Sequence, residues 1–126
     1  MSKAAATDPT ARFFDELAAR GEEPLLRKAS GRTRFDVVDG KRTLHWLVSV
    51  DRGKIAVSKQ NASADCAIRT QKAVFDKVAS GTLNAVAAVL RGDMAIEGDW
   101  RLLVRMQRLF PSSPRSLRTA ARRRRS

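Results

Sequence analysis

Apolar residues in the second half of the chain recur with the spacing of a helix. The first such stripe, at positions i, i+3, i+4 and i+7, consists of Leu83, Val86, Ala87 and Leu90. It predicts a helix from about Leu83 to Arg91 whose apolar side faces the interior. Thr82 stands directly before this helix and is its predicted N-cap, because its hydroxyl oxygen can accept a bond from a free N–H group.

A second helix is predicted from Trp100 to Phe110. Its apolar positions repeat the same spacing and are Leu102, Leu103, Met106, Leu109 and Phe110. Asp99 is the predicted N-cap, and Met94 and Ile96 form a short strand between the two helices. Two apolar helices joined by a strand suit a hydrophobic ligand space as well as they suit a core, and the pattern leaves both open.

The first half of the chain opens with another helix. Asp8 and Pro9 supply an N-cap and a proline suited to the first turn. The apolar stripe that follows consists of Phe13, Phe14, Leu17 and Ala18. Gly21 can end the helix in the left-handed conformation. A connector from Glu22 to Ser30, with a helical turn at Leu25 and Leu26, leads to the next element.

Between residues 31 and 70 the apolar period falls to 2, which is typical of strands. Four strands are predicted, and their apolar residues of one parity are Phe35, Val37, Leu44, Trp46, Val48, Val50, Ile55, Val57, Cys66 and Ile68. The opposite parity is mostly polar, as at His45, Ser49 and Arg69, so helices are expected to cover one face of an antiparallel sheet. Leu47 breaks this pattern and marks either an edge or an oligomer contact.

Gln71 to Ser80 is predicted as a helix that buries Phe75 and Val78. The element order is then α-β-β-β-β-α-α-β-α, and the fold class is α+β. Order, spacing and residues together resemble the lipid-binding domain of the sterol carrier protein family. The segments that carry this resemblance are GRTRFDVVDG (31–40), HWLVSVDRGKIAV (45–57), ADCAIRTQKAVFDKVASGTLNAVAAVLRGDMAIEGD (64–99) and LLVRMQRLF (102–110).

The resemblance implies a five-stranded, mostly antiparallel sheet with helices over one face and an apolar tunnel between the layers. It also implies a carrier of sterols, fatty acyl chains or fatty acyl-CoA that is not itself an enzyme. The implied floor of the tunnel is formed by Phe35, Trp46, Val48 and Val57. The implied roof is formed by Phe75, Val86, Leu90, Leu103, Met106 and Phe110. The same side chains would simply fill a core if the interior is solid.

The net charge of +12 is concentrated at one end of the chain. Half of it comes from the arginines Arg115, Arg118, Arg122, Arg123, Arg124 and Arg125. Residues 111–126 are therefore predicted to be a Pro/Ser linker followed by a disordered arginine-rich tail. Residues 1–7 are predicted to be a disordered N-terminus, which leaves one domain over residues 8–110.

The tail predicts attraction to an anionic membrane surface or to nucleic acid. It has no aromatic residue to stack on bases, and the chain has no recognisable nucleic-acid module, so specific nucleic-acid recognition is not expected. A solvated terminus that only aids solubility is the competing interpretation.

No catalytic or metal-binding constellation stands out. Cys66 is the single cysteine and His45 the single histidine, which argues against an intramolecular disulfide and a structural zinc site. His45 has the parity of the polar face, Cys66 faces inward as a small hydrophobe, and Asp65 points the other way. A non-catalytic protein without cofactors is expected. The alternative is an accessory or catalytic protein that acts on a lipid-like or polyketide-like substrate held in the same space.

The length of 126 residues suits one domain with a modest core. The N-terminus lacks the pattern of a signal peptide, and no apolar run approaches the roughly 20 residues that span a bilayer. A cytoplasmic location is therefore expected, and the oligomeric state is left open.

Overall fold

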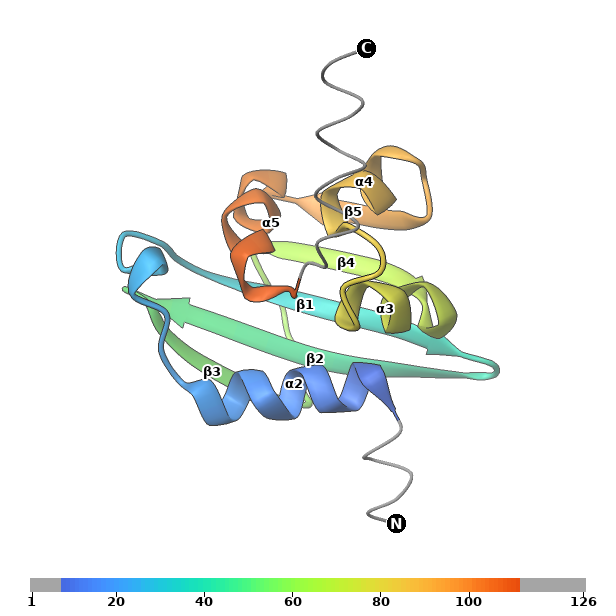
Figure 1. Cartoon of the computed structure of the whole chain (residues 1–126), viewed down its shortest axis with the longest axis horizontal. Coiled ribbons are helices and arrows are strands. Elements are labelled where there is room, and N and C mark those ends of the chain that lie inside the picture. Colours follow the sequence, from blue (N-terminus) through green and yellow to red (C-terminus); the bar gives the residue numbers. More distant parts are fainter. Residues whose placement is uncertain (1–7, 112–126) are drawn as a thin grey trace.

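A five-stranded sheet carries all of the long helices on one of its faces in the computed structural model, which describes residues 8–111 (Figure 1). The elements are α2 (Pro9–Arg20), η1 (Pro24–Leu26), β1 (Ser30–Asp39), β2 (Arg42–Asp51), β3 (Lys54–Ser58), β4 (Cys66–Gln71), α3 (Lys72–Ala79), α4 (Ala85–Leu90), β5 (Met94–Gly98), α5 (Trp100–Met106) and η2 (Gln107–Leu109). The predicted α+β class and the predicted order of helices and strands are confirmed.

The strands lie in the order β3-β2-β1-β4-β5. The β1–β2, β2–β3 and β4–β5 pairs are antiparallel, as expected, whereas β1 and β4 are parallel. Because β3 forms one edge and β4 lies beyond β1, residues 59–65 must cross a face of the sheet. They pass on the side away from the helices, where the Arg34 Nη1 donates to the Ala62 carbonyl at 2.9 Å (Figure 1).

Leu47 lies on the face of the sheet that this segment crosses. It lies opposite Arg34 in the register of β1 and β2 and is only 4% exposed, although its parity places it on the face without helices. The prediction that Leu47 marks an edge or an oligomer contact is therefore wrong. Periodicity showed which face Leu47 lies on, but not that a loop from elsewhere in the chain covers that face.

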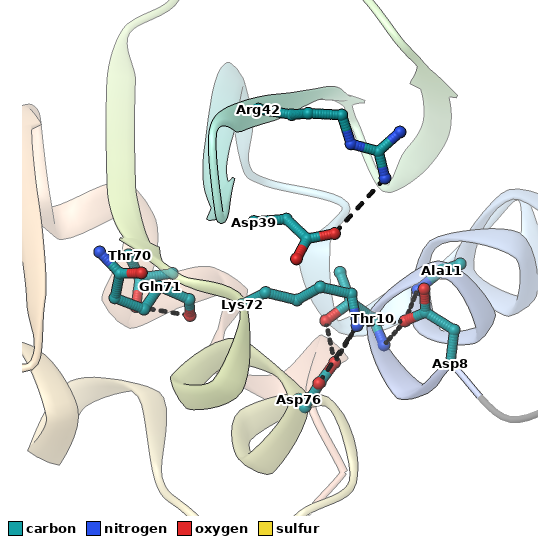
Figure 2. A network of polar contacts seen from close by, with 9 residues as sticks. All are labelled: Asp8, Thr10, Ala11, Asp39, Arg42, Thr70, Gln71, Lys72 and Asp76. Carbon is teal, nitrogen blue, oxygen red and sulfur yellow. Dashed lines mark hydrogen bonds and ion pairs between the residues drawn. The ribbon is translucent and has the colours of Figure 1, made fainter.

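Helix α2 has the predicted ends. The Asp8 carboxylate accepts from the N–H groups of Thr10 and Ala11, and Gly21 ends the helix with φ +65°. Figure 2 shows how the start of α2 is tied to α3. The Lys72 Nζ lies 3.0 Å from Asp8 Oδ1 and 3.1 Å from Asp76 Oδ1, and the buried Thr10 hydroxyl donates to Asp76 at 2.6 Å. This network fixes α2 across the sheet.

The next helix differs from its prediction. It runs from Ala85 to Leu90, and Asn84 rather than Thr82 caps it. The Thr82 N–H and hydroxyl both donate to the Lys77 carbonyl, so Thr82 closes the end of α3 instead of opening α4. Because of this turn, α4 begins at Ala85, two residues later than predicted. It buries Ala85 and Ala88, whereas Leu90 faces solvent and is 83% exposed. The predicted stripe of Leu83, Val86, Ala87 and Leu90 is therefore not the buried side.

The last helix begins at the predicted residue, Trp100, and buries the predicted apolar side. Asp99 caps it by accepting from the Arg101 N–H, and the buried residues are Leu102, Leu103, Met106 and Leu109. Its final turn, η2, tightens into a 3₁₀ helix, as helix ends often do. The predicted tail arginines and the predicted disordered N-terminus lie outside the described residues.

Candidate functional site

The predicted ligand space lies between the sheet and the helices. Six of the predicted wall residues are buried there in one hydrophobic cluster: Phe35, Trp46, Val48, Phe75, Leu103 and Met106. Val57 and Phe110 are partly buried and pack against the same cluster. The Thr33 hydroxyl, also buried, donates to the Met106 sulfur at 3.1 Å. The floor comes from β1, β2 and β3, and the roof from α3, α5 and the segment after η2.

Two predicted roof residues do not reach this interior. Leu90 extends into solvent, and Val86 is half-buried on α4 without joining the cluster. The physical reason is the late start of α4, which rotates its apolar stripe relative to the one predicted. Small residues, Ala85 and Ala88, take the inward positions and let α4 pack closely.

Two phenylalanines of α2 occupy the centre of the space and were missing from the predicted walls. Phe14 stacks on Trp46 with ring centres 4.6 Å apart and on Phe75 at 5.5 Å. Phe13 stacks on Phe110 at 4.9 Å, with the two rings only 4° from parallel. Their adjacent apolar positions were visible in the sequence, but the stripe did not show that they fit between floor and roof.

The rings of Phe35, Phe75 and Phe110 complete this aromatic cluster. Phe35 meets Phe75 edge-on at 5.5 Å, and Phe110 lies 6.1 Å from Phe75 and 6.2 Å from Phe35. Edge-to-face and offset pairs at these distances are favourable contacts. Rings of α2 therefore lie in the space between the sheet and the other helices where the tunnel is expected.

A groove on the surface leads to this cluster. It has a volume of about 310 Å³, and its lining residues are Phe13, Glu16, Leu17, Arg20, Ala79, Arg108, Leu109, Phe110 and Pro111. Phe13 and Phe110 line this groove and also pack in the aromatic cluster, with ring centres 6.0 Å and 6.1 Å from that of Phe75. Arg20 forms an ion pair with the buried Glu23, whereas Arg108 is exposed at the rim.

On the opposite face of the sheet, His45 belongs to a polar cluster that sequence reasoning did not identify. Its Nδ1 lies 2.7 Å from Asp36 Oδ1, and the Arg34 Nε donates to the same carboxylate at 2.9 Å. Burial raises the pKa of Asp36, but the hydrogen bonds from Arg34 and His45 outweigh it and hold that pKa below its ordinary value. The His45–Asp36 contact joins β2 to β1, so the cluster links these two strands.

Cys66 and Asp65 do not form a reactive pair. Cys66 is fully buried, and burial together with the nearby Asp99 and Asp65 carboxylates raises its pKa to about 11. A thiol with that pKa stays protonated near neutral pH and is a poor nucleophile. The Asp65 carboxylate accepts from the Arg32 N–H at 2.8 Å. The buried environment thus accounts for Cys66, and the hydrogen bond from the Arg32 N–H accounts for Asp65.

No group of three or more histidine, cysteine or acidic side chains in residues 8–111 is arranged to hold a metal ion. None of the helices described is long and apolar enough to cross a membrane.

Comparison with known proteins identifies a family for most of the chain. The model of the SCP-2 sterol transfer family matches residues 14–111. Human sterol carrier protein 2 is 30% identical over 97 residues, which make up 75% of this chain but only 18% of the human protein. The chain thus spans less than a fifth of that relative.

Solved structures share the fold. The palmitated SCP2L2 of Aedes aegypti superposes with a TM-score of 0.63 at 19% identity, over 77% of this chain and 89% of that one. The palmitate complex of a second Aedes aegypti sterol carrier protein 2 gives 0.59 at 18% identity, over 79% and 91%. An inverting sec-alkylsulfatase from a Pseudomonas species gives 0.63 at 21% identity, over 80% of this chain and 16% of the enzyme.

Proposed function

Since the chain belongs to the SCP-2 sterol transfer family, we propose that it binds one hydrophobic molecule between the sheet and the helices and carries it through water. The fatty acyl chain is the proposed ligand class. The observation that carries the proposal is the groove lined by the stacked Phe13 and Phe110 rings, which pack against the mostly apolar cluster between the sheet and the helices. Two relatives of the same fold are named for their palmitate.

Aromatic rings lie in contact with one another in this interior, so entry of an acyl chain requires side chains to move. Helix α2 is fixed at its start by Lys72 and at its end by the Ile55 N–H, which donates to the Gly21 carbonyl at 2.8 Å. Phe110 lies in extended backbone after η2 and is only half-buried. Rotation of the Phe110 ring away from Phe13 is the proposed opening step, and the acyl chain then takes the ring's place beside Phe35 and Phe75.

The energetics permit binding without polar recognition. Burying about 14 methylenes offers roughly 11 kcal/mol at about 0.8 kcal/mol each. Association costs at least about 4 kcal/mol, and the displaced Phe110 contacts reduce the gain further. The surplus is at most about 7 kcal/mol, which corresponds to a dissociation constant of about 10 μM or weaker. Arg108, which lines the groove, offers a positive charge to a carboxylate head group.

The proposed role is non-catalytic. The histidine and cysteine both have structural explanations, and family membership favours a carrier. The similarity to the sulfatase covers only a small part of that enzyme, and it supports a shared fold but not a shared activity. A cytoplasmic location and a membrane tether through the arginine tail stay predictions.

Intrinsic fluorescence tests the binding proposal directly. The chain has two tryptophans and no tyrosine, and Trp46 is 5% exposed whereas Trp100 is 60% exposed. In a Trp100→Phe variant, titration with palmitate is expected to change the Trp46 emission and to saturate near one ligand per chain. Palmitate is also expected to displace a naphthalene-type probe.

The matched control is a Trp46→Phe variant, in which the exposed Trp100 should not respond to monomeric palmitate. Failure of fatty acids, fatty acyl-CoA and sterols alike to displace the probe would contradict the proposal. Displacement by cholesterol in preference to palmitate would keep the carrier role but change the ligand class.

A further inference from the structure

The two outer strands of the sheet, β3 and β5, differ in how far the chain covers their free edges. At β3, the Ile55 N–H donates to the Gly21 carbonyl, and Glu22 forms a bridge to Lys54. No segment within residues 8–111 pairs with the free edge of β5, which lies at the opposite side of the sheet (Figure 1). The N–H and C=O groups that point away from an edge strand can pair with another strand.

The sequence of β5 suits such pairing. The strand, Met94–Gly98, lacks proline and lysine, which natural edge strands often use to prevent it. Ile96 packs against the core, whereas Ala95 and Glu97 are exposed on the other face. An added strand therefore finds an apolar row on one face and a polar row on the other.

Two opposite charges near this edge have no partner in the described part of the chain. Arg69 of β4 and Glu97 of β5 are exposed, and neither side chain forms an ion pair or a hydrogen bond there. Arg69 lies opposite Asp36 and Ala95 in the register of the sheet, so it is on the face without helices. Glu97 is two residues from Ala95 and lies on the same face. Only the short Ala95 side chain separates Arg69 from the free edge.

We propose that the free edge of β5 pairs with the β5 of a second copy of this chain. In an antiparallel pair around a two-fold axis, Ile96 lies opposite the partner's Ile96, and Ala95 lies opposite the partner's Glu97. Arg69, Ala95 and the partner's Glu97 then form one row across three adjacent strands. The axis creates the same row a second time, so both unpaired charges of each copy gain a partner.

Strand spacing allows this contact. Neighbouring strands lie about 4.8 Å apart, so the backbones at Arg69 and at the partner's Glu97 are about 10 Å apart. An arginine and a glutamate side chain can together span that distance over an alanine. A one-residue shift would bring the apolar row against the polar one. A two-residue shift pairs fewer residues of Met94–Gly98, and in one direction it sets Glu97 against the partner's Glu97.

The contact must supply its own attraction, because two copies with a net charge of +12 repel each other. Opposite charges placed in two symmetric rows do so locally. None of the residues that line the groove with Phe13 and Phe110 belongs to β5, so pairing leaves that groove open. The second copy is therefore a partner independent of the proposed ligand.

Sedimentation velocity of the full chain over a range of concentrations tests the proposal, and a monomer–dimer equilibrium is expected. Glu97→Arg sets two arginines in each row and should raise the dissociation constant of the dimer at least about tenfold, because like charges across an interface are costly. Arg69→Glu should do the same with two glutamates. The control is Asp15→Arg, which makes the same charge change as Glu97→Arg at an exposed position of α2 and should keep the dimer.

Mixing the two weakened variants separates the contact from any effect on folding. The Glu97→Arg chain has arginine at both positions, and the Arg69→Glu chain has glutamate at both. Both rows are then complementary only in the mixed dimer, which should form where each variant alone stays monomeric. The double variant with the two charges exchanged should dimerise again.

Amide hydrogen exchange locates the interface. Protection of Met94–Gly98 should rise with protein concentration, and protection of β3 should not. A chain that stays monomeric at about 1 mM would overturn the proposal, because no useful affinity is then left. A dimer that tolerates Glu97→Arg, or variants that do not associate when mixed, would also overturn it. Protection of β5 by a different protein, without self-association, would make a foreign strand the partner. None of these readings uses palmitate, so pairing and ligand binding fail or succeed separately.

Discussion

At the scale of single residues, Asp36 shows how a charge is kept inside the sheet. Its side chain is buried on the face without helices, and a carboxylate there without partners would be costly. Arg34 and His45 supply those partners, and Arg34 also donates to the Ala62 carbonyl of the crossing segment. Asp36 therefore helps fasten residues 59–65 across the face of the sheet on which Leu47 lies.

Replacing Asp36 with asparagine should destabilise the protein by about 2 kcal/mol at pH 7, because charge-assisted hydrogen bonds are lost. The folded pKa of Asp36 lies below the unfolded value near 3.8. Its stabilisation is therefore complete above that value and is lost as the pH falls through the folded pKa. Urea denaturation at several pH values should show the difference between the two proteins shrinking below about pH 4.

The exposed Asp39, which pairs with Arg42 at 3.4 Å, gives the control. Asp39→Asn should change stability by less than about 1 kcal/mol at pH 7, because exposed ion pairs contribute little. A difference for Asp36→Asn that stayed constant down to pH 3 would contradict the assignment.

At the scale of elements, β5 depends on a close approach between two backbones. The Asp65 carbonyl accepts from the Asp99 N–H at 2.8 Å, and Gly98 lies beside that carbonyl with φ +88°. A Cβ at Gly98 would collide with the Asp65 oxygen. Glycine at this position thus lets β5 pair with β4 and lets α5 begin directly afterwards.

Gly98→Ala should cost about 2–4 kcal/mol, the sum of left-handed backbone strain and a clash with backbone atoms that cannot rotate away. Gly92 is the matched comparison, because its φ is +81° but a Cβ there would meet nothing within 4 Å. Gly92→Ala should cost only the strain, about 1 kcal/mol. Equal losses in thermal unfolding of the two variants would show that the approach to Asp65 does not matter.

At the scale of the whole molecule, the aromatic cluster joins all layers of the domain. Phe13 and Phe14 come from α2, Phe35 and Trp46 from the sheet, and Phe75 and Phe110 from the helical layer. The same rings therefore stabilise the fold and occupy the space proposed for a ligand. Under the proposed function, a bound ligand replaces some of these ring contacts with its own.

Phe110→Ala should lower the stability of the ligand-free protein by about 2 kcal/mol, less than for a fully buried phenylalanine. Palmitate should then raise the melting temperature of this variant more than that of the unmodified protein, because its acyl chain fills the space that the ring leaves. Palmitate stabilises the protein because it binds only the folded state.

Leu90→Ala serves as the control, because Leu90 was also predicted as a wall residue but is exposed. It should leave both the melting temperature and the palmitate response unchanged. An equal palmitate response in all three proteins would contradict the place given to the ligand.

The sequence by itself determined the helix ends at Asp8, Gly21 and Asp99, the parity of the strands, and the burial of residues such as Phe35, Trp46 and Phe75. Local hydrogen bonds and apolar periodicity decide those features, and both depend only on residues that are close together in the sequence. Only the tertiary structure decided the parallel pairing of β1 with β4, the burial of Leu47 and the exposure of Leu90. Each of these depends on which distant segment covers a face. The same holds for Phe13 and Phe14, whose rings fill the space between layers because α2 is held over the sheet by Lys72.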